Sequence, residues 1–113
     1  LPDVTPQGYH RYIGAGLTLR RGAMRANALQ RAALLDDIMA QMPLYGEIDL
    51  PVEIIHGRAD TTVPLSIHSE PLSRQIEGAV LTELEGIGHM PHHAALPQVI
   101  DAIHRTAARA GLN

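Results

Sequence analysis

The stretch VEIIHGRADTTVP, residues 52–64, decides what kind of fold this chain can adopt. Its first part, residues 52–57, carries two isoleucines at its centre and ends in Gly57, a pattern typical of a buried strand. A second run, AVLTELE at residues 79–85, alternates apolar and polar residues as a strand with one buried face does. Helical patterns precede, separate and follow the two runs. We therefore expect an α/β fold whose parallel strands are joined by helical crossovers.

Three helices are expected around these strands, from the spacing of apolar residues and from N-cap, proline and glycine signals. The first covers residues 27–42, the second 66–76 and the last 97–110. Residues 1–22 are rich in glycine and proline, and predict a loop with a short helix at 9–19. Met39 and Met42 of the first helix are expected to fill a core.

A parallel pair of strands leaves both edges of its sheet open. Strands as apolar as residues 52–57 are usually paired on both sides and covered on both faces. The sequence therefore predicts a piece of a larger sheet, incomplete on its own.

The composition narrows the classes of function. The chain has 113 residues, 45% of them hydrophobic, a formal net charge of −3 and no cysteine. Disulfides and thiolate zinc sites are excluded, and neither nucleic acid nor a membrane is expected as a partner. A histidine cluster at positions 89, 92 and 93 lacks further secured ligands, so no metal and no cofactor is expected. Because no signal-like segment is visible, we expect a cytoplasmic location.

Two polar residues stand beyond the carboxyl ends of the predicted strands, where open parallel sheets hold their functional groups. Asp60 follows the first strand, and His89 follows the second within GIGH, residues 86–89. A carboxylate there can accept the Nδ1–H of an imidazole, so that Nε2 is ready to take a proton. The alternatives are that Asp60 is a turn or N-cap residue and that His89 is an ordinary loop histidine.

These two motifs resemble those of one family. GRADTTVP, residues 57–64, resembles the G-x-x-D-x-x-V-P signature after strand seven of α/β-hydrolases, and GIGH resembles the G-x-G-H signature after strand eight. The acid precedes the histidine by 29 residues, an order and spacing that also match. The resemblance implies that residues 23–113 are the C-terminal segment of such a hydrolase, the last two strands with flanking helices. It implies that residues 1–22 are the end of a cap or lid.

The resemblance also implies a mechanism. A serine on a G-x-S-x-G elbow would attack an ester or related acyl bond of a small-molecule substrate, with His89 as general base and Asp60 as its orienting acid. The elbow and the oxyanion hole would come from an N-terminal part that acts as partner, because the chain contains no such motif and Ser66, Ser69 and Ser73 lie on a predicted helix. The chain alone is therefore expected to be inactive.

Three alternatives stay open at this point. The same acid and histidine would serve an epoxide hydrolase or haloalkane dehalogenase, in which an aspartate is the nucleophile. The chain could instead be a non-catalytic truncated or interaction fragment. Tyr9 and Tyr12 could bind substrate, as cap tyrosines do in some relatives, or could simply pack the cap onto the core.

Overall fold

The structure is a computed structural model that describes residues 3–112. Contacts divide the chain into two compact units. One consists of Leu1–Val4 with Tyr45–Asn113 and holds both strands, and the other is Thr5–Leu44. The assignment of residues 1–22 to a cap and of residues 23–113 to a hydrolase core stays a prediction.

The unit of residues 5–44 is helical. It contains α1 (Tyr9–Tyr12), a 3₁₀ helix at Ala15–Leu19 and α2 (Arg21–Gln41), and a further 3₁₀ helix at Met42–Glu47 follows. The expected start of the long helix at Asn27 is wrong by six residues, because Gly22 in its first turn is outweighed by a run of good helix formers.

Every residue of α2 is exposed, and Met42 directly after it is 42% exposed, so the prediction that Met39 and Met42 fill a core is wrong for this structure. Leu35 and Met39 expose 70% and 60% of their surface. The physical reason is that the apolar residues of α2 are spread around the helix instead of forming one face.

The sheet has two parallel strands, β1 (Glu53–Gly57) and β2 (Val80–Leu84). Their register pairs Glu53 with Val80 and continues to Gly57 with Leu84. The predicted α/β arrangement with a parallel pair is confirmed, and each strand lies within the residues expected for it. Burial is less complete than predicted, since β1 is half-buried except at its last two residues.

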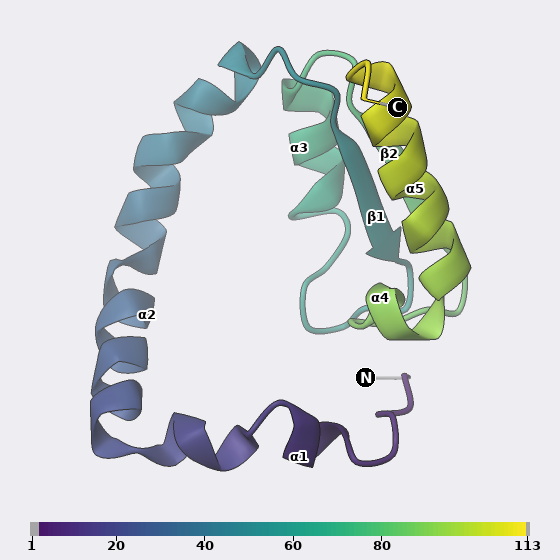
Figure 1. The fold of residues 1–113 in the computed structure, drawn as a ribbon. Helices are drawn as coiled ribbons and strands as arrows, with labels where there is room; N and C mark the ends of the chain where they lie inside the picture. Colours follow the sequence, from purple (N-terminus) through teal and green to yellow (C-terminus); the bar gives the residue numbers. More distant parts are fainter. Residues whose placement is uncertain (1–2, 113) are drawn as a thin grey trace. The chain divides into compact units, whose positions relative to one another are not determined.

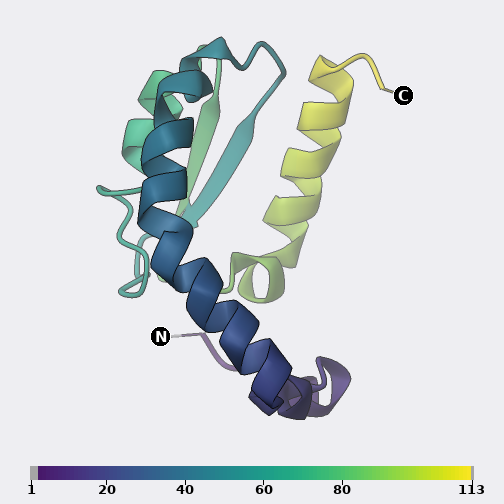
Figure 2. The same ribbon diagram turned by 90° about the vertical axis from the view of Figure 1, so that its left-hand side faces the viewer.

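Two helices cover opposite faces of this pair, α3 (Ser69–Gln75) and α5 (Leu96–Arg109), while the single turn α4 (Pro91–Ala94) precedes α5. Figures 1 and 2 show the strands lying between α3 and α5. The alternation of side chains along β1 explains this, because His56 bonds with Ser69 of α3 while Glu53 and Ile55 face α5. The predicted helix at 66–76 is shorter than expected, and Pro71 lies in its first turn, where a missing N–H is tolerated.

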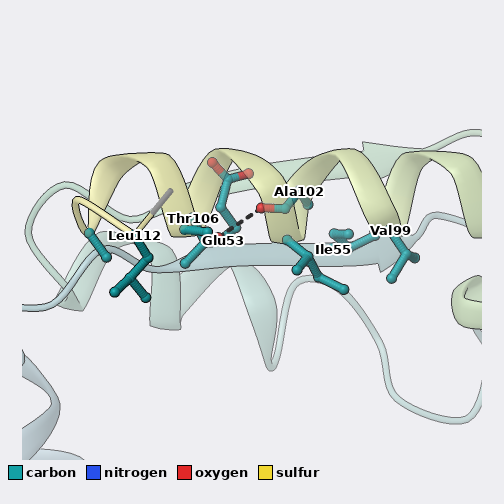
Figure 3. A pocket seen from close by; sticks show the side chains of 9 residues that line it. Glu53, Ile55, Val99, Ala102, Thr106 and Leu112 are labelled. Carbon is teal, nitrogen blue, oxygen red and sulfur yellow. Dashed lines mark hydrogen bonds between the residues drawn. The ribbon is translucent and has the colours of Figure 1, made fainter.

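Ion pairs join β1 to α5, and a pocket lies beside them. Arg105 Nη2 lies 2.8 Å from a carboxyl oxygen of Glu53, and Arg109 Nη1 lies 3.4 Å from the other. Beside them a pocket of about 380 Å³ opens between Ile55, Val99 and Ala102, as Figure 3 shows. Within residues 3–112, only three hydrophobic residues are buried, namely Ile76, Ala95 and Ala102.

A search for membrane-spanning helices among the described residues found none of sufficient length and apolar character.

Candidate active site

The loops after the two strands bring Asp60 and His89 together. Because β1 and β2 are parallel and in register, Gly57 and Leu84 end the strands side by side, and each loop starts from the same edge. His89 Nδ1 lies 2.8 Å from Asp60 Oδ2. The two residues predicted to act as a pair are thus within hydrogen-bonding distance.

Asp60 is held from both of its carboxyl oxygens. While Oδ2 faces the imidazole, Oδ1 accepts the backbone N–H of Thr62 at 2.8 Å and of Val63 at 3.0 Å. The residue therefore also makes the turn that was considered as an alternative role for it. Its side chain is only 6% exposed, and burial raises its pKa. The hydrogen bonds from His89, Val63 and Thr62 outweigh burial and lower the pKa of Asp60 to about 2.

The negative charge of Asp60 determines which nitrogen of the His89 ring carries the proton. An ionised carboxylate can only accept hydrogen bonds, so the bond at Oδ2 requires the proton on Nδ1 of His89. In the neutral ring this leaves Nε2 with a free lone pair. The side chain of His89 is 44% exposed, so Nε2 belongs to a ring that solvent reaches. Such an imidazole can take a proton from a nucleophile and return it to a leaving group.

Gly57 allows the histidine loop to pass close to β1. A Cβ at this position would lie 2.3 Å from the carbonyl oxygen of Ile87 and 2.4 Å from that of Gly88. The same loop is anchored by Ala59, whose N–H donates to the Ile87 carbonyl at 2.9 Å. Only glycine fits at the end of β1 with the loop in this position. The sequence pattern indicated Gly57 as the end of the strand but carried no signal for this close approach.

A second carboxylate holds the backbone around His89. Asp3 Oδ1 accepts the N–H of Gly88 at 2.8 Å, and Oδ2 accepts the N–H of Met90 at 2.7 Å. These two bonds lower the pKa of Asp3, and the nearby charge of Asp60 raises it by less. The sequence carried no signal for this contact, because 85 residues separate Asp3 from Gly88.

The serines of the chain are engaged away from the pair or exposed. Ser69 Oγ lies 2.7 Å from Nδ1 of the buried His56, and Ser73 Oγ donates to the carbonyl of Glu70 at 2.9 Å. Ser66 is exposed. His56 is therefore buried and hydrogen-bonded through Nδ1.

The sequence also singled out two tyrosines and two further histidines. Tyr9 and Tyr12 belong to the unit of residues 5–44, where Tyr12 is 90% exposed, and their role in substrate binding stays a prediction. His92 and His93 are exposed at α4, with ring centroids 4.2 Å apart. In the part of the chain that the structure describes, no group of three or more histidines or carboxylates is placed to hold a metal ion.

No model of a protein family matches this sequence, and no curated protein matches it.

Proposed function

We propose that this chain is the C-terminal segment of an α/β-hydrolase that cleaves an ester or related acyl bond. Asp60 and His89 are two members of its catalytic triad. The nucleophilic serine and the oxyanion hole come from a part of the protein outside residues 1–113. In this mechanism His89 Nε2 removes the serine proton as the hydroxyl attacks the acyl carbon, and then donates it to the leaving oxygen.

One observation carries the proposal, the 2.8 Å contact between Asp60 and His89 at the carboxyl ends of adjacent parallel strands. A general base of this kind needs an imidazole that solvent reaches and whose Nε2 carries no proton. It also needs a buried, ionised carboxylate that orients the ring, and His89 and Asp60 meet both requirements. The resemblance of residues 57–64 and 86–89 to the family signatures supports the same reading.

The surface of the strand-bearing unit supports the view that further protein packs on it. Val80 of β2 and Ile100 and Ile103 of α5 are 41%, 41% and 60% exposed. Among the described residues β1 pairs with β2 alone, so the other edge of this apolar strand has no strand neighbour. Larger exposed apolar surfaces of this kind usually mark interaction sites.

The test is hydrolysis of p-nitrophenyl acetate by the protein that joins residues 1–113 to the segment with the nucleophile. We expect enzyme-like turnover that His89→Ala reduces by about 10³-fold or more while circular dichroism stays unchanged. His104→Ala, which changes an exposed histidine of α5, serves as the matched control and should keep full activity. Turnover that survives His89→Ala would contradict the proposal, as would equal turnover by residues 1–113 alone.

The alternatives give different outcomes in the same assay. An aspartate nucleophile would accumulate an alkyl-enzyme ester with an epoxide or haloalkane in the His89→Ala variant, because the histidine then serves only to activate the hydrolytic water. A non-catalytic fragment would show no His89-dependent turnover on any of these substrates.

A further inference from the structure

We infer that Asp3 is a positioning residue of this site, whose carboxylate holds the backbone on both sides of His89. The inference deepens the proposed function and rests on it for its catalytic meaning. Asp3 touches no reacting group, so any effect on turnover passes through His89.

The geometry of the contact is that of a clamp. Two oxygens of one carboxylate accept two N–H groups, those of Gly88 and Met90, which directly precede and follow His89. Each oxygen accepts from a different N–H group. The two bonds together therefore fix the orientation of the carboxyl group and of both peptide units. Hydrogen bonds to an ionised acceptor are shorter and stronger than those between neutral groups.

The clamp adds to the bond from Ala59, which holds the loop at Ile87, because two glycines restrict the backbone of this loop little. Gly86 adopts a positive φ of 71°, and Gly88 is a second glycine directly before the histidine. Glycine loses more conformational freedom on ordering than any other residue. Asp60 holds the His89 ring, but ring and carboxylate can stay aligned only while the backbone that carries the ring is fixed.

Three variants of the intact protein separate the clamp from general effects. Asp3→Asn keeps the size of the side chain but replaces one acceptor oxygen by an NH₂ group that faces a donor. Asp3→Glu keeps both acceptor oxygens and the charge. Asp49→Asn makes the same charge change at an exposed carboxylate of the same compact unit and is the control.

The first readout is amide hydrogen exchange by NMR. In Asp3→Asn we expect exchange at Gly88 and Met90 to be about tenfold faster than in the parent, whereas the strand amides of Ile54 and Thr82 are unchanged. In the same variant, the NMR signal of the hydrogen-bonded Nδ1 proton of His89 should become weaker. Exchange at Gly88 and Met90 that matches the Asp49→Asn control would overturn the clamp, and so would equal acceleration at the strand amides.

The second readout is the division between kcat and KM. Because Asp3 binds the protein backbone and no substrate, Asp3→Asn should lower kcat about tenfold and leave KM within twofold. Asp3→Glu should recover most of the loss. An unchanged kcat, or a loss that Asp3→Glu shares in full, contradicts the positioning role.

The two proposals can fail separately. If the protein shows no hydrolysis at all, the proposed function fails, while the exchange rates and the His89 proton still decide the clamp. If hydrolysis depends on His89 but Asp3→Asn equals the control in both readouts, the clamp fails and the hydrolase remains.

Discussion

His89 and Asp60 are 29 residues apart in the chain, yet Nδ1 of the histidine lies 2.8 Å from Oδ2 of the aspartate. The other oxygen of Asp60 is held by two backbone N–H groups of its own turn. The carboxylate is therefore anchored to the turn that follows β1, independently of the imidazole. The ring can change its charge or its partner at Nε2 without loosening the residue that orients it.

Replacing Asp60 by asparagine should remove most turnover in the assembled protein. The asparagine NH₂ group can donate to Nδ1 and so favours the tautomer with the proton on Nε2, which cannot act as a base. We expect kcat to fall about 10³- to 10⁴-fold with the fold retained. Steady-state kinetics of Asp60→Asn and of the exposed control Asp49→Asn measure this. A loss of less than tenfold would argue against Asp60 as the orienting acid.

Activity should depend on the protonation of the histidine. A protonated imidazole cannot accept the serine proton, and histidine is the side chain that changes charge between pH 5 and 8. Asp60, with a pKa of about 2, stays ionised over this whole range. We therefore expect kcat/KM to be lower at pH 5 than at pH 8, because only the neutral imidazole can act as a base. A flat profile over that interval would speak against His89 as the general base.

Acid should remove the stability that the ionised form of Asp60 contributes. Its pKa is lowered from 3.8 to about 2, so folding favours the ionised form. The contribution is fully present above the unfolded value of 3.8 and is lost as the pH falls through about 2. It amounts to at most about 2 kcal/mol of unfolding free energy.

Denaturant titrations at pH 6 and pH 2 check this expectation. The difference in unfolding free energy between the parent and Asp60→Asn should shrink as the pH is lowered. A difference that stays constant would mean that the charge of Asp60 is not stabilised in the folded protein.

Adding a methyl group at Gly57 should push the histidine loop away from β1. A Cβ there would lie 2.3 Å from a backbone oxygen, which no rotation of a side chain can relieve. We expect Gly57→Ala to lower the unfolding free energy by about 1–3 kcal/mol and to reduce turnover. Gly22→Ala in α2 meets no atom within 4 Å and is the control, with a gain of up to about 1 kcal/mol. Equal effects of the two substitutions would show that the close approach does not exist.

The ion pairs of Glu53 should matter more than those on the surface. The Glu53 side chain is 4% exposed, and its hydrogen bond to Arg105 lowers its pKa despite burial. Because both arginines are partly exposed and screened, we expect Glu53→Gln to cost only about 1–2 kcal/mol of unfolding free energy. Glu70→Gln, which breaks the exposed pair with Arg74, should cost less than about 0.5 kcal/mol. Thermal and denaturant unfolding of both variants provide the comparison, and the reverse order would contradict it.

The sequence by itself determined the two strands, their parallel arrangement and the placement of Asp60 and His89 at one edge of the sheet. These follow from local patterns, because a strand ends where its apolar run meets glycine, and parallel strands bring their carboxyl ends together. The start and the exposure of α2 were not foreseen, since a helix composed of strong helix formers carries little information about which side is covered.

Only the tertiary structure decided the contacts between distant parts of the chain. The clamp of Asp3 on the His89 loop, the close passage of that loop over Gly57 and the bond between His56 and Ser69 depend on how segments 13 to 87 residues apart are brought together. Such contacts arise from the path of the backbone through space, and residue types and spacing along the chain do not encode that path locally.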